Sequence, residues 1–444
     1  MKEEKRRKEG KEGRKEGKGE EKEGVRREGK IFITGIYSRE ILDSRGNPTV
    51  EVDVLTNLSF GRASSPSGAS RGEREAVELR DEERRFFGKG VKKAVKNVIE
   101  IGKYLIGKDP RRQKEIDDFI IKKSGKNKEK LGGNATTALS LAVCASAASS
   151  LNLPIYKYLN KNAKTLPIPL LNVLNGGKHA GNYLAIQEFM IVPVKFKSFK
   201  DAITGACEVY YQLGNFLKEK YGKISTNVGD EGGYAPPLKY TKEALDSIEK
   251  SIEECGYKKK IFLALDCAAS NFYNHKENLY FIDEKKFTKE ELFDYYKDLV
   301  SSYKIISIED PLEENDFEGF SMMNKLGIQI VGDDLFTSNI NYLKKGIKIH
   351  SANAILLKIN QVGTLSEAME TAKYAMKNNY NVIVSHRSGE TECTFIADFA
   401  VALECGQIKT GAPARGERVA KYNQLLRIEE ELGNPKYAKW KGRL

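Results

Sequence analysis

The stretch "VIVSH", Val382–His386, decides how the chain folds, because an apolar run ends there in an ionisable side chain. Five other short apolar runs end in the same way. The ionisable residues that end the six runs are Asp266, Glu309, Asp333, Lys358, His386 and Lys409. Successive members are 43, 24, 25, 28 and 23 residues apart, and most of these intervals suit a strand, a loop, a helix and a return loop. The repeat therefore predicts strands separated by helices.

Near-continuous apolar strands of this kind are typical of a parallel sheet covered by helices on both faces. Helical spacing in the intervening stretch 366–379 agrees with this pattern. So many consecutive units favour closure into a barrel, in which catalytic groups lie at the carboxyl ends of the strands. One charge at one strand end is usually a side chain that reaches water. Six in succession indicate a shared site.

The sequence ahead of these runs is organised differently. Strand-like alternation comes first, in "PTVEVDVLT" (48–56), and helical spacing follows over 90–107. Strands followed by helices are typical of an α+β domain. A proline-marked apolar stretch at 166–177 marks the change. We therefore expect an α/β protein with a TIM-type (β/α)8-like barrel as its C-terminal domain, residues 164–444, and a smaller α+β N-terminal domain, residues 31–163.

Residues 1–30 are predicted to be a disordered charged tail. They hold 13 of the 74 basic and 9 of the 62 acidic residues, and Val25 is their only internal aliphatic residue. Such a segment cannot bury enough apolar surface to fold. Its alternating charges and lack of aromatic residues make a solvated tail a better interpretation than nucleic-acid binding.

The composition as a whole, with 40% hydrophobic and 31% charged residues, is that of a soluble globular protein. No apolar run approaches the roughly 18 residues of a membrane span. The six cysteines show neither C-x-x-C spacing nor the histidine partners of a zinc site, and they are interpreted as free thiols. Free thiols favour a reducing compartment, so we expect a cytoplasmic location without membrane association.

The three acidic strand ends, Asp266, Glu309 and Asp333, would repel one another in one barrel mouth unless a cation lay between them. Oxygen ligands select magnesium, calcium or manganese over zinc. Lys358 would be a base in such a site if burial and Lys409, a second cation, lowered its pKa. A lysine base and a divalent cation together suit the removal of a proton from a carbon next to a carboxylate.

Three glycine-rich stretches also carry polar side chains. Asp230 and Glu231 lie in "NVGDEGGYAPP", His179 lies in "NGGKHAGN" and Ser70 lies in "SSPSGASRGE". Each stretch taken alone is an ordinary surface loop or turn. Close to a site, the same stretches would be lids, since glycine lets a backbone approach a ligand.

Taken together, these stretches resemble the enolase family from about Ile31 to the C-terminus. The motifs that carry the resemblance are "REILDSRGNPTVEV", "SPSGAS", "EAVELRD", "NGGKHAGN", "QEFMIVP", "NVGDEGGYAP", "SIEDP", "VGDDL", "LLKINQVGTLSE", "SHRSGET", "IKTGAP" and "ERVAKYNQLLRIEEELG". The resemblance implies the reversible dehydration of 2-phospho-D-glycerate to phosphoenolpyruvate in glycolysis and gluconeogenesis. It also implies a homodimer and two Mg²⁺ ions per active site when substrate is bound.

The resemblance implies a role for each matching residue. Lys358 would be the base at C2, and Glu231 the acid that protonates the leaving C3 hydroxyl. Asp266, Glu309 and Asp333 would hold the first Mg²⁺, and Ser70 would help to hold the second. Arg387 and Ser388 would bind the phosphate. The implied substrate-binding residues are His179, Glu188, Glu309, Asp333, Ser385, His386, Arg387, Ser388 and Lys409.

Two other interpretations compete with the enolase reaction. A relative that acts on carboxylates without phosphate usually carries a K-x-K pair on a barrel strand, whereas "AILLKIN" offers only Lys358. A non-catalytic binding protein on the same scaffold would be expected to have lost some site residues, and none of those named is missing. Both comparisons favour the enolase reaction.

Overall fold

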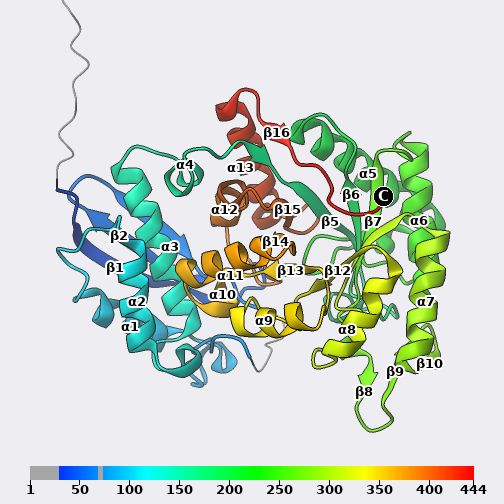
Figure 1. The fold of residues 1–444 in the computed structure, drawn as a ribbon, viewed down its shortest axis with the longest axis horizontal. Helices are drawn as coiled ribbons and strands as arrows, with labels where there is room; N and C mark the ends of the chain where they lie inside the picture. The colour runs from blue at the N-terminus through cyan, green and yellow to red at the C-terminus, as the bar shows by residue number, and fades with distance from the viewer. Residues whose placement is uncertain (1–29, 69–73) are drawn as a thin grey trace, which may run out of the picture. The chain divides into compact units, whose positions relative to one another are not determined.

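The computed structural model describes residues 30–68 and 74–444 (Figure 1). Ser70 lies outside the described residues, as does the predicted tail up to residue 29. From Ile31 to Leu444 the chain forms one compact unit. The expected domain boundary between residues 163 and 164 therefore stays a prediction.

An antiparallel sheet begins the described chain. Its strands are β1 (Ile33–Leu42), β2 (Pro48–Thr56) and β3 (Phe60–Ser64), paired in that order. The strand predicted from "PTVEVDVLT" is confirmed, since β2 has the same bounds. Val50, Val52 and Val54 on β2 are fully buried, as period-two alternation requires of the face that meets the core.

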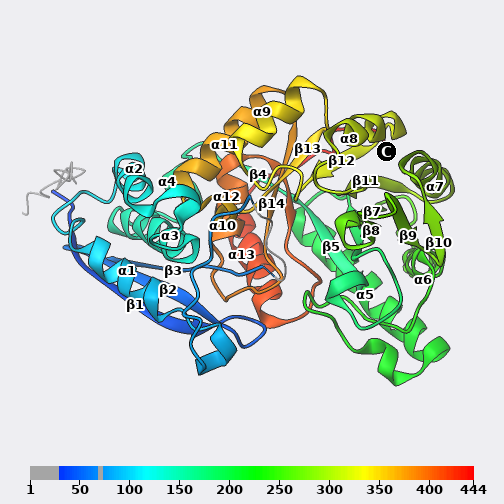
Figure 2. The ribbon, with the colours of Figure 1, turned by 90° about the horizontal axis from the view of Figure 1, so that it is seen from below.

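Four helices follow this sheet: α1 (Lys92–Gly102), α2 (Gln113–Ser124), α3 (Gly133–Ser150) and α4 (Ile155–Leu159). The α3 helix packs against β2 and β3, and Figure 2 shows it beside the sheet. Small buried side chains on α3, such as Ala138 and Ala142, allow this close packing. The order of strands before helices is the α+β arrangement that we predicted.

Eight strands then close into a barrel in the order β11-β12-β13-β14-β15-β5-β6-β7. Their bounds are β5 Ile168–Asn175, β6 Glu188–Pro193, β7 Ile261–Asp266, β11 Ile305–Glu309, β12 Gln329–Gly332, β13 Ala354–Leu357, β14 Asn381–Ser385 and β15 Gly406–Lys409. The predicted barrel is therefore confirmed.

The parallel pairing predicted for the six runs is confirmed for β7 and β11 to β15, but the strand β6 runs in the opposite direction. This strand pairs antiparallel with both β5 and β7. The connection between β5 and β6, residues 176–187, contains no α-helix, and a chain without a crossover helix returns in the opposite direction. The apolar run that forms β6 carries no signal of its direction.

Helices surround the barrel strands, as Figures 1 and 2 show. Their bounds are α5 Phe199–Tyr221, α6 Thr241–Glu254, α7 Lys289–Ser302, α8 Phe317–Met323, α9 Ile340–Lys348, α10 Ile359–Val362, α11 Leu365–Lys377, α12 Phe395–Leu403 and α13 Gly416–Leu432. Five short strands complete the fold: β8 Tyr273–Asn274, β9 Leu279–Ile282 and β10 Lys285–Phe287 form one sheet, and β4 Thr165–Leu166 pairs with β16 Lys436–Tyr437.

The barrel interior is a packed apolar core. Its buried members include Ile168, Leu170, Met190, Val192, Ala264, Ile306, Val331, Leu356 and Ile383. Side chains that fill a barrel leave its ends as the places where a ligand can bind. All six residues predicted at strand ends lie at the carboxyl ends: three are the last residue of a strand and three follow one directly.

Two further observations concern the chain as a whole. The six cysteines are all unpaired, as predicted. Within residues 30–68 and 74–444, no helix combines the length and the apolar character that crossing a bilayer requires.

Candidate active site

One pocket at the carboxyl ends of the barrel strands gathers most of the predicted site residues. Those that line it are His179, Glu188, Glu231, Asp266, Asp333, Lys358, Ser385, His386, Arg387, Ser388 and Lys409. Glu309 is joined to them through Lys409, whose Nζ lies 2.9 Å from both carboxylate oxygens of Glu309. Ser70 lies outside the described residues. The structure thus brings together residues that are far apart in the sequence.

One part of the pocket, which we name the lysine side, consists of Asp266, Glu309, Asp333, Lys358 and Lys409. Lys409 Nζ lies 2.8 Å from Asp266 Oδ2, in addition to its contacts with Glu309. Lys358 Nζ donates a hydrogen bond to Asp333 Oδ2. Each carboxylate of the lysine side is therefore in contact with an ammonium group.

The pKa of Lys358 does not behave as predicted. Burial lowers this pKa and the nearby cations Arg387 and Lys409 lower it further, but the carboxylates around Lys358, above all Asp333 and then Glu309, together outweigh them. The pKa of Lys358 consequently lies above its ordinary value. The expectation of a lowered pKa is wrong because it took no account of an acidic residue in direct contact.

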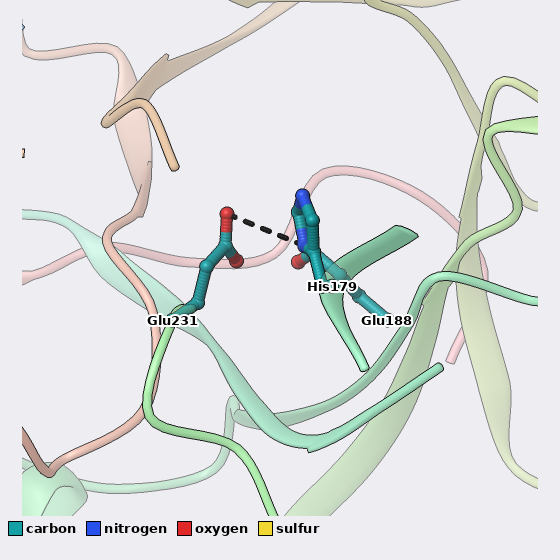
Figure 3. A group of neighbouring side chains, drawn as sticks. All are labelled: His179, Glu188 and Glu231. Atoms are coloured by element: carbon teal, nitrogen blue, oxygen red, sulfur yellow. Dashed lines mark ion pairs between the residues drawn. The ribbon is translucent and has the colours of Figure 1, made fainter. Parts of the chain in front are cut away.

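The other part of the pocket, which we name the histidine side, consists of His179, Glu188, Glu231 and His386. Glu231 Oε1 lies 3.7 Å from His179 Nδ1 and 3.4 Å from His386 Nε2. Glu188 Oε1 lies 3.9 Å from His179 Nδ1, and Figure 3 shows this imidazole next to both carboxyl groups. Among the described residues, His179 Nδ1, His386 Nε2 and Glu188 Oε2 are buried and have no hydrogen-bond partner. Buried polar atoms are usually hydrogen-bonded, so these three are open to a partner that a ligand would supply.

The two carboxyl groups of the histidine side differ in protonation. Burial raises the pKa of Glu231, but the neighbouring His386 and His179 side chains together with the Arg418 cation hold it well below its ordinary value. Burial and the Glu231 carboxylate together raise the pKa of Glu188 well above its ordinary value. A proton shared by this pair therefore resides mainly on Glu188.

Glu231 is held in place by a tight glycine turn. Gly232 has φ +84°, and a Cβ atom there would lie 2.8 Å from the carbonyl oxygen of Ala414, so glycine fits where other residues are strained. The backbone N–H of Ala412 donates to the Glu231 carbonyl oxygen at 2.9 Å. Asn172 on β5 donates its side-chain amide to Glu231 Oε2 at 3.1 Å. The glycine-rich stretch is thus part of the site.

The predicted phosphate residues follow β14. Arg387 forms a two-point ion pair with Glu75, with Nη1 at 2.8 Å from Oε2 and Nη2 at 3.3 Å from Oε1. The carbonyl oxygen of Ser388 accepts a hydrogen bond from the Ser44 hydroxyl at 3.3 Å. Ser385 donates its hydroxyl to the His386 carbonyl oxygen at 3.0 Å. Glu75 was missed by the sequence analysis, since nothing in its local sequence links it to Arg387.

Two more acidic residues in the pocket were missed. Asp310 accepts hydrogen bonds from the backbone N–H groups of Asp333 and Asp334 at 3.0 and 2.8 Å, and so orients the turn that carries Asp333. Burial, with a contribution from Asp333, raises the pKa of Asp334 to about 7. Both residues directly follow predicted ones, in "SIEDP" and "VGDDL", which was a usable signal.

The donor atoms of the pocket fit a hard divalent cation. In the described part of the chain, two groups bring possible ligand atoms within 4.8 Å of one another: His179, Glu188 and Glu231, and Asp310, Asp333 and Asp334. Of the predicted carboxylate ligands, only Asp333 belongs to either group, and Asp266 and Glu309 contact Lys409. Burial and the Asp266 charge raise the pKa of Glu309 well above its ordinary value, which indicates too little positive charge for these oxygens. A pocket whose carboxylate oxygens outnumber its cationic side chains suits Mg²⁺, Ca²⁺ or Mn²⁺.

Comparisons with known proteins agree with this site. A family model described as the N-terminal domain of enolase matches residues 33–159, and one described as the C-terminal TIM barrel domain of enolase matches residues 163–443. The enolase of Methanocaldococcus jannaschii is 57% identical over 411 residues, which cover 91% of this chain and 97% of that protein. The enolase of Pyrococcus furiosus is 57% identical over 408 residues, covering 90% and 95%. The chain therefore belongs to the enolase family, and it is an enzyme of the lyase class.

Proposed function

We propose that the chain catalyses the reversible, magnesium-dependent dehydration of 2-phospho-D-glycerate to phosphoenolpyruvate in glycolysis and gluconeogenesis. Family membership supports the reaction. One observation supports the residue assignment: a buried lysine, Lys358, and a buried carboxyl group, Glu231, line the same pocket in opposite chemical settings. Removing a proton from C2 requires a base, and releasing the C3 hydroxyl requires an acid.

Lys358 is the proposed base and Glu231 the proposed acid. The neutral Nζ of Lys358 takes the proton from C2, and the electron pair of the broken C–H bond becomes part of the C2=C3 double bond. As the C3–O bond breaks, Glu231 gives its proton to the departing hydroxyl, which leaves as water. The reaction oxidises and reduces nothing overall, so it needs no redox partner.

The protonation states in this structure suit the reverse direction. The raised pKa of Lys358 keeps a proton on Nζ, and the lowered pKa of Glu231 leaves its carboxylate ionised. Hydration of phosphoenolpyruvate needs a proton donor at C2 and a base for water, which these states supply. For dehydration, the ion pair of Lys358 with Asp333 must weaken and Glu231 must gain a proton. The raised pKa of Glu188 supports a role for this residue as the source of that proton.

Asp266, Glu309 and Asp333 are the proposed ligands of the Mg²⁺ ion that the family resemblance implies, and Ser70 is proposed for a second ion. The enolase family is metal-dependent, and the donor chemistry of the pocket supports this assignment. When bound, the cations would stabilise the negative charge that develops on the substrate carboxylate. Lys409 positions Asp266 and Glu309 through its contacts with both.

The remaining predicted residues are proposed to bind substrate. The Arg387 guanidinium gives paired hydrogen bonds to phosphate oxygens, and its ion pair with Glu75 orients the guanidinium plane. Ser388 adds a hydroxyl beside Arg387. His179 lies in the connection between β5 and β6, from which it would close over the ligand. Ser385 and His386 line the same rim of the pocket.

An absorbance assay tests the proposed reaction. Phosphoenolpyruvate is followed as it forms from 2-phosphoglycerate, first with Mg²⁺, then with a chelator, then with Mg²⁺ restored. We expect turnover with Mg²⁺, loss of turnover with the chelator and recovery after Mg²⁺ is added back. The proposal would be contradicted if turnover persisted in the presence of the chelator. It would also be contradicted if no turnover occurred with Mg²⁺ present.

The cytoplasmic location and the homodimer are part of the same proposal. Unpaired cysteines support a reducing compartment, and the family resemblance supports the dimer. Sedimentation velocity on the purified chain measures the oligomeric state directly. A single monomeric species at micromolar concentration would contradict the homodimer.

A further inference from the structure

Arg418 on α13 is a fully buried cation behind the histidine side of the pocket. Its Nη2 donates to the carbonyl oxygens of Ser388 at 2.7 Å and Asp230 at 3.1 Å. Its Nη1 donates to the carbonyl oxygen of Arg387 at 2.6 Å. One guanidinium thus joins the turn that carries Glu231 to the turn that follows β14.

The same Nη1 lies 2.6 Å from His386 Nδ1. Arginine has hydrogen-bond donors and no acceptor, so Nδ1 must be the accepting nitrogen of this imidazole. A neutral imidazole that accepts at Nδ1 carries its proton on Nε2. His386 Nε2 is the atom that lies 3.4 Å from Glu231 Oε1.

We propose that Arg418 is a positioning residue that fixes His386 in the Nε2–H tautomer, so that His386 presents a donor to Glu231. This inference rests on the proposed role of Glu231 as the acid. A neutral imidazole protonated at Nε2 presents an N–H to Glu231, whose Oε1 lies 3.4 Å away, and cannot take a proton from Glu231 through that nitrogen. A proton that Glu231 gains for dehydration is therefore not lost to His386 and stays available for the leaving C3 hydroxyl.

The surroundings of His386 agree with a neutral ring. Burial lowers the pKa of His386 to about 4; Glu231 and Glu390 act in the opposite direction, and the positive charge of Arg418 adds to the lowering. At neutral pH the ring then holds one proton, and the choice between its two nitrogens is set by hydrogen bonding.

The packing around Arg418 leaves little freedom for its side chain. Gly411 has φ +82°, and a Cβ atom there would lie 2.9 Å from Arg418 Cδ and 2.8 Å from the Glu231 carbonyl oxygen. The two terminal nitrogens of Arg418 have four N–H bonds, and they have four acceptors within hydrogen-bond distance. The guanidinium is thus held by the same contacts that place it against His386.

The tautomer can be read by NMR of the imidazole ¹⁵N nuclei in protein labelled only at histidine. The chain has four histidines, so few signals need assignment, and a His386→Gln variant identifies the one of interest. Protonated and unprotonated ring nitrogens have well-separated ¹⁵N shifts. In the unaltered full chain at pH 7, we expect His386 to show a protonated Nε2 and an unprotonated Nδ1.

Arg418→Met removes every donor while keeping an unbranched side chain. We expect a folded Arg418→Met variant to lose the single Nε2–H tautomer and kcat to fall on the order of 100-fold. This is less than the roughly 10⁴-fold cost of a wrong tautomer in an imidazole that itself transfers the proton. Arg418→Lys, which keeps a donor-only cation, should recover part of both the tautomer and the rate.

Lys421→Met is the matched control, because Lys421 is also a fully buried cation on α13. Its Nζ contacts Glu390 Oε2 at 2.8 Å and the Thr391 carbonyl oxygen at 2.6 Å. We expect this variant to lose stability and to keep the His386 tautomer.

Three results would overturn the inference: an Nδ1–H tautomer in the unaltered chain, an unchanged tautomer in folded Arg418→Met, or a changed tautomer with an unchanged kcat. If Arg418→Met does not fold, the His386 tautomer in the unaltered chain and in Arg418→Lys still tests the inference. Failure of the proposed function is distinguishable, because it would show as missing turnover in the unaltered chain while the NMR result stands.

Discussion

The lysine side and the histidine side of the pocket are both buried and acidic, yet they are stabilised differently. On the lysine side, Lys409 contacts its carboxylates at 2.8–2.9 Å, and Lys358 is paired with Asp333. On the histidine side, the imidazole–carboxyl contacts are 3.4–3.9 Å, and Lys409 Nζ lies 3.2 Å from Glu188 Oε1. Three buried polar atoms there have no hydrogen-bond partner in the described residues. Leaving buried polar atoms unpaired costs stability.

The difference indicates how each half of the reaction begins. The lysine side is complete, so its ion pair must be disrupted before Lys358 can accept a proton. The histidine side is incomplete, so the C3 hydroxyl group of the substrate would supply a missing partner. Proton removal at C2 and loss of the C3 hydroxyl should therefore respond separately to substitutions on the two sides.

Lys358→Ala should have the largest effect. Removing the base should lower kcat by about 10⁴-fold, the upper end of what a positioned proton acceptor contributes. It should also stop exchange of the C2 proton with solvent deuterium, because no other group is proposed to accept that proton. Proton NMR of 2-phosphoglycerate incubated with the variant in D₂O measures the exchange.

An exposed lysine on α11 provides the control for this substitution. Lys373→Ala should exchange and turn over as the unaltered chain does. Continued exchange in a folded Lys358→Ala variant would reject Lys358 as the base.

Gly411→Ala should act on the histidine side alone. The new Cβ would meet the Glu231 carbonyl oxygen at 2.8 Å in a left-handed conformation, so we expect a loss of more than about 2 kcal/mol in the free energy of unfolding. Dehydration should also slow more than C2 exchange. Urea denaturation and the two activity measurements test this together.

Gly433→Ala is the matched control, since Gly433 has φ +71° and no atom within 4 Å of its added Cβ. It should cost about 1 kcal/mol, the price of the left-handed backbone alone. Equal losses of stability for the two glycine variants would show that contact with Glu231 is unimportant.

Deleting residues 1–30 should have the smallest effect. The segment holds none of the proposed site residues. We expect C2 exchange and dehydration both to stay within about twofold of the full chain, in line with surface changes of about 0.5 kcal/mol or less. A large drop in either rate would make the segment part of the working enzyme.

Much of this architecture could be predicted from the sequence. Apolar runs that end in an ionisable residue located six barrel strands and the charged rim of the pocket, because burial and strand length leave a direct trace in residue type. The direction of β6 could not be predicted in the same way. It depends on the connection over residues 176–187, which contains no α-helix.

The pKa values and ion pairs of the site residues were harder to predict than which residues line the pocket. The pKa of Lys358 depends on its separation from Asp333, which lies 25 residues away in the chain. Arg418 lies in a charged helical stretch, where arginine is usually exposed, and Glu75 pairs with Arg387 across 312 residues. Contacts of this kind are set by tertiary packing and leave no local pattern.

The most direct test of separate acid and base groups is C2 exchange in Glu231→Gln. The variant is incubated with 2-phosphoglycerate and Mg²⁺ in D₂O, and the C2 proton signal and phosphoenolpyruvate are followed together. The C2 proton should exchange while almost no phosphoenolpyruvate forms, since Lys358 remains and the acid is lost. Loss of exchange and of dehydration to the same degree would contradict a base and an acid on different sides of the pocket.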